Sequence, residues 1–275
     1  GIIDGDGSLV MKLYYTRDKY KIYVPYTKTE GGQCNLYNES CKYGTEITLK
    51  VWTNAGYAFD GWFEGNILVS SESPYTFIAE KTITLNVKWT PHTDTPYKVE
   101  YYLQNIDNDN YTLYETVNLE GTTNSTVNAE IKTYEHFTYY SSYSVTSGII
   151  AGNGSLVLKV SYIRNQYTIK VSGENSSAGT CNEINSEYRF GKEIKLKAMT
   201  KDGYTFDGWY EKEILVSEEN PYIITVEKDI TLTAKWHANT NTPYRVEYYL
   251  INQKGEYKLK ESYDFQGTTD KYESA

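Results

Sequence analysis

The chain of 275 residues carries a formal net charge of −9 and contains 30 tyrosines against seven phenylalanines. The acidic balance argues against nucleic acid or an anionic membrane as a partner, because both need clustered lysine and arginine. The mean hydropathy is −0.60, and no apolar run reaches the roughly 18 residues of a membrane span, so we expect no membrane insertion here. The sequence shows no leader peptide, and we take it as a piece of a longer protein.

An internal repeat with an offset of 147 residues, as from Gly1 to Gly148, organises the chain. Three pairs of segments show it: 1–10 and 148–157, 59–62 and 206–209, 95–103 and 242–250. The period is too long for a solenoid coil or a propeller blade and has the length of one or two small domains. We therefore expect an elongated array of small modules, with two different modules in each repeat.

The modules are called A and B. In chain order we expect the final hairpin of an incomplete module B, a module A, a complete module B, a second module A and the first half of another module B. Their boundaries are 1–16, 17–90, 91–164, 165–238 and 239–275. Each module is close to the lower size limit for an independent hydrophobic core.

Module A is expected to consist of strands. Apolar and polar residues alternate in the first copy over 19–24, 47–51 and 82–89, and the segment 58–63 carries Phe59 and Trp62. The second copy keeps the apolar positions Ile194, Leu196, Ala198, Ile230, Leu232, Ala234 and Trp236. A period of two predicts sheets with one buried and one wet face. The segment after the first strand, around Gly31 and Gly32, predicts a loop with room for one helical turn.

Module B opens with a predicted hairpin in which Val99, Tyr101 and Leu103 alternate, residues 107–110 turn, and 111–119 return. A helix is expected next, capped by Asn124 or Ser125, with Val127, Ile131 and Tyr134 on one face. A second hairpin turns at Gly152–Gly154, and its last strand buries four residues: Leu156, Leu158, Val160 and Tyr162. Hairpin, helix and hairpin follow one another in the order of a β-grasp, so the fold class is mainly β or α+β, with tandem β-grasp-like (ubiquitin-like) modules.

Two kinds of connection join the modules. Residues 90–96, repeated at 237–243, are rich in proline, asparagine and threonine and predict short, stiff spacers. Residues 162–167 contain no glycine or proline. We expect one strand to run there from module B almost directly into module A.

The cysteines and the acidic turns each leave an alternative open. Cys34 and Cys41 fit either a disulfide in an oxidising setting or two separate thiols, and the third cysteine is Cys181. The segments 4–7 and 107–110 offer oxygen ligands that suit calcium, yet their residue types are also those that tight turns need. Because the repeat does not keep the acidic residues, we favour turns and expect no metal and no cofactor.

Catalysis is not expected. A nucleophile needs a base beside it, and the three histidines, His92, His136 and His237, belong to no catalytic motif. Four tryptophans recur in register and are expected in the cores: Trp62, Trp89, Trp209 and Trp236. The ligand-contact candidates are the tyrosines of module B, because exposed tyrosines stack on sugars and fill interfaces; they are Tyr102, Tyr139, Tyr140 and Tyr143. The alternative is a sheet with tyrosine on both faces.

Two sequence motifs, each present twice, carry a resemblance to a known family. Residues 56–63 and 203–210 show Gly-Tyr-x-Phe-x-Gly-Trp. Residues 229–236 show Ile-Thr-Leu-x-Ala-x-Trp, and residues 82–89 show the same motif with valine in place of alanine. The chain thereby resembles the internalin-type B-repeat, or Listeria–Bacteroides repeat, while module B resembles mucin-binding-protein-like (MucBP-like) repeats more loosely. The resemblance implies β-grasp modules of a secreted, often wall-anchored bacterial surface protein, and it implies no particular ligand. The cysteines depart from the usual pattern.

Three functions fit these observations. The first is a non-catalytic extracellular spacer and adhesion segment of a bacterial cell-surface protein. The second is a glycan- or mucin-binding module that uses the exposed tyrosines, with a host or matrix glycoprotein, a glycan or another surface protein as partner. The third is a head-to-tail filament subunit, in which strand donation completes the incomplete module B segments at 1–16 and 239–275.

Overall fold

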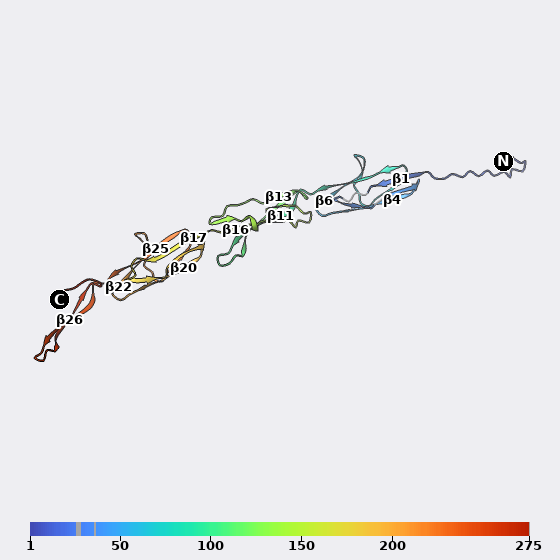
Figure 1. The fold of residues 1–275 in the computed structure, drawn as a ribbon. Helices are drawn as coiled ribbons and strands as arrows, with labels where there is room; N and C mark the ends of the chain where they lie inside the picture. Colours follow the sequence, from blue (N-terminus) through green and yellow to red (C-terminus); the bar gives the residue numbers. More distant parts are fainter. Residues whose placement is uncertain (26–28, 36, 275) are drawn as a thin grey trace. The chain divides into compact units, whose positions relative to one another are not determined.

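The computed structural model describes residues 1–25, 29–35 and 37–274 (Figure 1). These residues form strands numbered β1 to β27 and one 3-10 turn, Ser141–Tyr143 (η1), and no α-helix occurs among them. In the described ranges no helix has the length and apolar character needed to cross a bilayer. The chain is therefore mainly β, with many small sheets.

The chain divides into two compact units, and each unit takes residues from several parts of the sequence. Unit 1 consists of residues 1–101, 114–130 and 141–160. Unit 2 consists of residues 102–113, 131–140 and 161–275. Module B contributes to both units, whereas each complete copy of module A lies within one of them.

The first copy of module A, in unit 1, is built from short strands. They are Lys19–Val24 (β1), Gly32–Cys34 (β2), Tyr37–Lys42 (β3), Glu46–Leu49 (β4), Val51–Thr53 (β5), Tyr57–Glu64 (β6), Ile67–Ser70 (β7), Tyr75–Ile78 (β8), Ile83–Thr84 (β9) and Asn86–Pro91 (β10). Their sheet orders are β3-β1-β9, β10-β6-β7, β2-β5 and β4-β8. β1 and β9 run parallel, and the other pairs are antiparallel.

The alternating apolar side chains of this copy face inward, as their spacing predicts. Ile22, Leu49 and Trp62 are fully buried, and Ile47, Leu85 and Val87 belong to the same core cluster. The ring of Phe59 meets that of Trp62 edge-on, with centroids 6.0 Å apart. Burying these aliphatic and aromatic side chains supplies most of the stability of so small a core.

The repeated glycine of the tryptophan motif marks a β-bulge. Gly61 has a φ of 137°, and the β6–β10 register shifts beside it. A Cβ at Gly61 would lie 2.6 Å from the carbonyl oxygen of Ser70, so no larger residue fits without a backbone shift. Gly208 repeats this geometry with a φ of 134°. The bulge re-aims the strand just before Trp62 and Trp209, both fully buried.

The second copy of module A, in unit 2, has the same elements in longer sheets. Its strands are Gln166–Gly173 (β17), Gly179–Cys181 (β18), Ile184–Arg189 (β19), Glu193–Leu196 (β20), Ala198–Thr200 (β21), Tyr204–Glu211 (β22), Ile214–Ser217 (β23), Tyr222–Thr225 (β24) and Ile230–Ala238 (β25). They form a five-stranded sheet, β19-β17-β25-β22-β23, and two pairs, β18-β21 and β20-β24. β25 is one uninterrupted strand, whereas the equivalent segment of the first copy is divided into β9 and β10.

Module B contains a four-stranded sheet of order β12-β11-β16-β14 and a pair β13-β15. The strands are Thr95–Gln104 (β11), Tyr111–Gly121 (β12), Thr126–Asn128 (β13), Phe137–Tyr139 (β14), Ser147–Ile149 (β15) and Val157–Arg164 (β16). The first predicted hairpin is confirmed. Leu158, Val160 and Tyr162 are buried in β16, as predicted, whereas Leu156 precedes the strand and is only half-buried.

The helix predicted after Asn124 is wrong. Residues 126–128 form β13, which pairs with β15, and residues 129–136 are irregular. Asn124 itself has a φ of 67°, which is a left-handed turn conformation and not that of a helix N-cap. The threonines, asparagines and valine around it have low helix propensity. The described part of module B therefore lacks the helix on which the β-grasp expectation rested.

The second predicted hairpin is also wrong in its pairing. The turn at Gly152–Gly154 exists, and Gly154 has a φ of 72°. It connects β15 to β16, however, and these strands belong to different sheets. β15 pairs with β13, and β16 has a partner on each side, β11 and β14, so no edge of β16 is left for β15.

The loop predicted between the first two strands of module A contains strands instead. β2 and β3 lie there, while residues 26–28 and 36 fall outside the described residues. Cys34 and Cys41 are each 7% exposed in the core cluster of this copy, and no disulfide joins them. Of the two alternatives, the structure has separate thiols. The alternating exposure in β2 fits a half-buried strand that the glycines obscured in the sequence.

The connections between modules are shorter than predicted. β10 continues to Pro91 and β11 begins at Thr95, so only residues 92–94 remain between strands instead of a seven-residue spacer. The repeated connection likewise shrinks to 239–241, before Thr242–Ile251 (β26). In the connection at 162–167, which contains no glycine or proline, β16 ends at Arg164 and β17 begins at Gln166, as expected.

Candidate functional site

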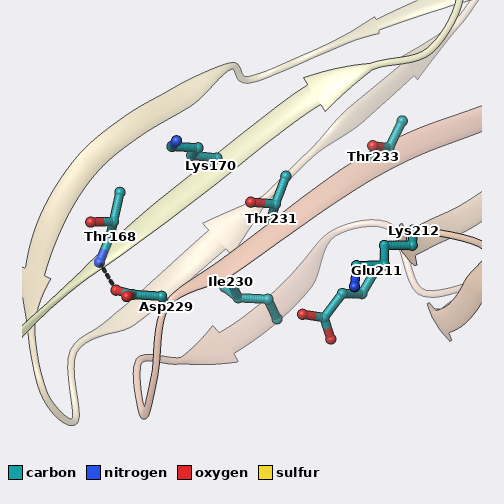
Figure 2. Close-up of a pocket in the computed structure, with 8 residues that line it drawn as sticks. All are labelled: Thr168, Lys170, Glu211, Lys212, Asp229, Ile230, Thr231 and Thr233. Carbon is teal, nitrogen blue, oxygen red and sulfur yellow. Dashed lines mark hydrogen bonds between the residues drawn. The ribbon is translucent and has the colours of Figure 1, made fainter.

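The hollow on the second copy of module A does not bring reactive groups together. One hollow of about 540 Å³ lies on the second copy of module A and is lined by Thr168, Lys170, Glu211, Lys212, Asp229, Ile230, Thr231 and Thr233. Figure 2 shows these side chains spread along neighbouring strands without converging. The backbone N–H of Thr168 donates to Asp229 Oδ1 at 2.7 Å. In the first copy the hydroxyl of Thr82 accepts the equivalent bond from the backbone N–H of Lys21 at 3.1 Å. The side chain at this position therefore accepts a backbone hydrogen bond in both copies.

The side chains of His237 and His136 make structural contacts. His237 contacts Asp207 through Nδ1. At the equivalent place Thr90 donates to Asp60 Oδ2 at 2.8 Å. The aspartate of the tryptophan motif therefore accepts a bond from the adjacent strand in both copies, whichever residue donates it. His136 stacks on an aromatic ring of module A. Among the described residues no group of three histidines, cysteines or carboxylates is placed to hold a metal ion.

The candidate tyrosines of module B are distributed over both units. Tyr102, Tyr139 and Tyr140 are half-buried and belong to unit 2, and the ring of Tyr139 meets buried Tyr162 edge-on at 6.1 Å. Tyr143 lies in η1, belongs to unit 1 and is 63% exposed. Tyr139 thus also serves the core, whereas Tyr143 presents most of its ring to solvent.

An exposed tryptophan adds a candidate that the sequence reasoning missed. Trp52 in β5 is 53% exposed, and the equivalent Met199 is 55% exposed. The signal was present in the sequence, because Trp52 alone of the five tryptophans has no tryptophan at the repeat offset. A residue free to change between copies is not one that the core requires.

The joint from module A to module B in unit 1 is held by backbone hydrogen bonds. His92 N–H donates to the carbonyl oxygen of Gly56 at 2.8 Å, and Thr123 N–H donates to the carbonyl oxygen of His92 at 2.8 Å. The hydroxyls of Thr95 and Thr123 form a third bond of 2.6 Å, and both threonines are 4% exposed. The three residues of the connection are thus fixed on both sides.

The same three bonds recur in the A-to-B joint of unit 2. Asn239 N–H donates to Gly203 at 2.8 Å, Thr269 N–H donates to Asn239 at 2.9 Å, and the hydroxyls of Thr242 and Thr269 lie 2.5 Å apart. The middle residue changes from histidine to asparagine because only its backbone takes part. A geometry that survives this exchange is a property of the repeat.

Glycine is required in this joint. Gly56 has a φ of 81° and Gly203 a φ of 85°. A Cβ would lie 2.5 Å from Thr123 Oγ1 in the first joint and 2.6 Å from Thr269 Oγ1 in the second. Both the left-handed backbone and the close approach exclude a side chain.

A hydrogen bond between side chains also connects the two modules at each of these joints. Asn124 (φ 67°) donates to Glu30, and at the equivalent place Tyr204 donates to Asp270 (φ 60°). The hydrogen bond to Asp270 raises the pKa of Tyr204 above its usual value. This side-chain hydrogen bond is therefore made by different residues in the two copies at the same point of the backbone.

The joint from module B to the second module A centres on Arg164. Its Nε donates to the carbonyl oxygen of Gln104 at 3.1 Å, and its Nη1 donates to that of Phe190 at 3.2 Å. The guanidinium also lies 4.6 Å from the ring centroid of Phe137. Burial, and then the nearby charge of Arg189, lower the pKa of Arg164. One side chain thus connects both modules within unit 2.

The arginine recurs at the start of the first module A. Arg17 Nη1 donates to the carbonyl oxygen of Tyr43 at 3.1 Å, the counterpart of the bond from Arg164 to Phe190. His136 adds to the second joint, where its ring stacks on Phe190 with centroids 3.9 Å apart. The arginine-to-carbonyl bond is therefore the shared element of both B-to-A joints.

The acidic turn of module B docks on module A of unit 2. Arg189 donates to the carbonyl oxygen of Asn108 at 2.6 Å and pairs with Asp109, and Lys192 pairs with Asp107 at 2.7 Å. Both carboxylates of this turn, Asp107 and Asp109, thus contact cations. For residues 107–110 these contacts favour the interpretation as a structural turn over that as a calcium site.

Comparison with known proteins agrees with the repeated motifs. The family described as the divergent InlB B-repeat domain, a non-catalytic repeat family typical of bacterial surface proteins, matches residues 22–93 and 167–240. The chain is 23% identical over 235 residues to a protein of Evansella cellulosilytica named "Putative Gly-rich membrane protein". That match covers 83% of the chain and 26% of the relative, so the chain spans about a quarter of its length. Because the two matched segments make up more than half of the sequence, the chain belongs to the divergent InlB B-repeat domain family and carries two copies of the repeat.

Proposed function

We propose that this chain is a non-catalytic spacer and adhesion segment of a bacterial cell-surface protein. Modules A and B alternate in it, and each connection is fixed by hydrogen bonds so that the segment holds other parts of the protein at a distance. Binding by any single module is weak in this proposal and is strengthened by repetition. The MucBP-like character of module B and the module boundaries given above are part of the proposal.

The recurrence of the A-to-B joint carries the proposal. A flexible linker needs no particular contact, whereas a stiff spacer must restrict the few residues between its modules. The bonds from His92 to Gly56 and from Asn239 to Gly203 restrict them in both copies. Each joint leaves three residues outside the strands, too few for independent motion once they are bonded on both sides.

The surface is consistent with a non-catalytic role. A nucleophile must lie within hydrogen-bond reach of its base. In the described part of the chain, the contacts of the two histidine rings His136 and His237 are with an aromatic ring, a tyrosine hydroxyl and carboxylates. These contacts position modules and strands. An extracellular, cell-surface location is supported by the family and by the name of the relative.

Small-angle X-ray scattering on the chain tests the spacer proposal. A compact globule of this length has a radius of gyration of about 19 Å. We expect a value at least about twice as large and a pair-distance distribution with the long tail of a rod. A value near that of a globule would contradict the proposal.

A second candidate function is glycan or mucin binding, favoured by the exposure of Tyr143 and Trp52 (63% and 53%). A glycan array on the chain tests it. Binding that falls on Tyr143→Ala, but not on Tyr114→Ala at a position 62% exposed in the same unit, would support module B as the binding site. An array without signal would leave the spacer function alone.

A further inference from the structure

A hollow of about 610 Å³ lies where module B meets the second module A, within unit 2. Its lining includes the cations Arg164 and Arg189 and the side-chain amides of Gln104 and Asn165. None of the described residues that line it is an aspartate or a glutamate. The whole chain has a net charge of −9, so this hollow is a local concentration of positive charge on an acidic protein.

The guanidinium of Arg164 hydrogen-bonds only carbonyl oxygens, those of Gln104 and Phe190, within the described ranges. A guanidinium carries more N–H donors than these two bonds use, so donors remain for a further acceptor. Burial, and then the charge of Arg189, lower the pKa of Arg164. Both effects disfavour the charged form, and an anion beside the guanidinium offsets them.

The acidic turn of module B holds Arg189 in place. Its Nη1 donates to the carbonyl oxygen of Asn108 at 2.6 Å, and its Nη2 pairs with Asp109. The side chain of Arg189 is 19% exposed, whereas that of Asp109 is 88% exposed and does not line the hollow. Because solvent screens so exposed a carboxylate, Asp109 neutralises the charge of the hollow only in part.

Two side-chain amides add further donors to the lining. Gln104 Oε1 accepts from the backbone N–H of Arg164 at 3.1 Å, and Asn165 Oδ1 accepts from the hydroxyl of Thr138 at 2.8 Å. Since the oxygen of each amide is occupied, each NH2 group is left to donate, and neither has an acceptor among the described residues. The lining is therefore rich in donors, which is what an oxyanion requires.

We propose that this hollow binds an oxyanion, the carboxylate or sulfate group of a small ligand, through Arg164 and Arg189 with the amides of Gln104 and Asn165 as further donors. The hollow is larger than the oxyanion alone and has room for one sugar ring. Acidic sugars carry these groups, and free inorganic anions present the same chemistry. The site lies in unit 2, apart from Tyr143 and Trp52 of unit 1, so it depends on neither function proposed above.

The first copy of module A carries its own negative charge at the equivalent place. Arg17 and Lys42 occupy the positions of Arg164 and Arg189, and Asp18 occupies that of Asn165. The pair of cations is thus kept in both copies, while the neutral amide is specific to the second. We therefore expect an anion to bind at the second position and not at the first.

NMR titration of the chain at constant ionic strength tests the proposal. Sodium sulfate and sodium glucuronate are the two probes, and glucose is the neutral sugar that serves as control. We expect saturable shifts of the side-chain NH2 signals of Gln104 and Asn165 with an oxyanion and none with glucose. Stronger binding of glucuronate than of sulfate would identify an acidic sugar as the source, and the reverse order a free inorganic anion. No saturable shift with either probe would overturn the proposal.

Matched variants separate this site from general charge effects. Asn165→Asp brings the carboxylate of the first copy into the hollow and keeps an acceptor for Thr138, and it should raise the apparent dissociation constant for sulfate about tenfold or more. Asn185→Asp adds the same charge to an exposed residue of the same module that does not line the hollow, and it should bind sulfate as the parent chain does.

A second variant covers the case in which Asn165→Asp disturbs the joint itself. Gln166 is exposed and lines the hollow, and its side chain makes no hydrogen bond within the described residues. Gln166→Glu should therefore weaken sulfate binding and leave the thermal stability of the chain unchanged. Dissociation constants for Asn165→Asp and Gln166→Glu that equal that of Asn185→Asp would overturn the proposal.

Discussion

Thr95 and Thr123 face each other across the first A-to-B joint, with their hydroxyl oxygens 2.6 Å apart and both residues 4% exposed. Two residues far apart in sequence thus share a bond in a place that water does not reach. Thr242 and Thr269 repeat the contact at 2.5 Å. The joint is therefore built like a small core, and substitutions in it should behave like core substitutions.

Replacing one of these threonines should leave a buried hydroxyl without its partner. We expect Thr95→Val to lower the free energy of unfolding of the first joint by about 1–3 kcal/mol. The double variant Thr95→Val, Thr123→Val should be less destabilised than the sum of the single variants, because no polar group then remains unpaired. Urea unfolding of the four chains of this cycle measures the coupling, and strictly additive effects would show that the bond contributes nothing.

A side chain at Gly56 should strain the same joint. Its φ of 81° and the 2.5 Å approach of a Cβ to Thr123 Oγ1 predict that Gly56→Ala destabilises the chain by about 1–3 kcal/mol. Gly65 is a matched control, since its φ of 62° is also left-handed but a Cβ there meets nothing within 4 Å. Equal shifts of the urea midpoint for Gly56→Ala and Gly65→Ala would mean that packing at the joint is not tight.

Arg164→Lys should loosen the joint between module B and the second module A. A lysine keeps the charge but not the fork that reaches both Gln104 and Phe190. We expect faster proteolytic cleavage near Asn165, with little change in thermal stability of the separate cores. The control is Arg245→Lys, where the arginine contacts an exposed Asp264 at 2.8 Å, and that variant should be cleaved at the parent rate.

The thiol of Cys34 should make stability depend on alkaline pH. Burial raises its pKa above the usual 9.0, so the folded state retains the proton that the unfolded state releases. The contribution is complete below pH 9 and is lost as pH rises from there through the folded pKa. The decline in the urea midpoint above pH 9 should therefore be smaller for Cys34→Ala than for the parent chain, and identical slopes would contradict a buried thiol.

The period-two pattern was sufficient to predict most long strands. β1 was predicted at its observed bounds, and the inward positions of β4 and β16 agree with the spacing of Ile47, Leu49, Leu158 and Val160. Alternation succeeds there because one face of each strand is buried along its whole length. The β11 hairpin succeeds for the same reason.

The failures have local physical causes. The spacing of Val127, Ile131 and Tyr134 fits a helix. The backbone of Asn124 is left-handed, however, and residues 126–128 form β13, which pairs with β15. Tertiary pairing commonly overrides so short an apolar period. The strand β2 has only three residues, too few to show a period of two, and β3 exposes Asn38, Glu39, Ser40 and Lys42 around buried Cys41.

The joints were largely invisible in the sequence. Their bonds use backbone groups of Gly56, His92 and Thr123, and backbone groups leave little trace in residue types. The second copy keeps the glycine but has Asn239 in place of His92 and, after a hairpin turn one residue shorter, Asp270 in place of Asn124. Only the structure shows that these exchanges preserve one geometry.

Amide hydrogen exchange at four positions tests most directly whether the joints are fixed. The N–H groups of His92, Thr123, Asn239 and Thr269 are the donors of the repeated backbone bonds. We expect all four to exchange as slowly as amides inside the strands, with each equivalent pair protected alike. Exchange at the rate of exposed loop amides, such as that of Gly65, would show that the modules move independently and would contradict the spacer with fixed joints.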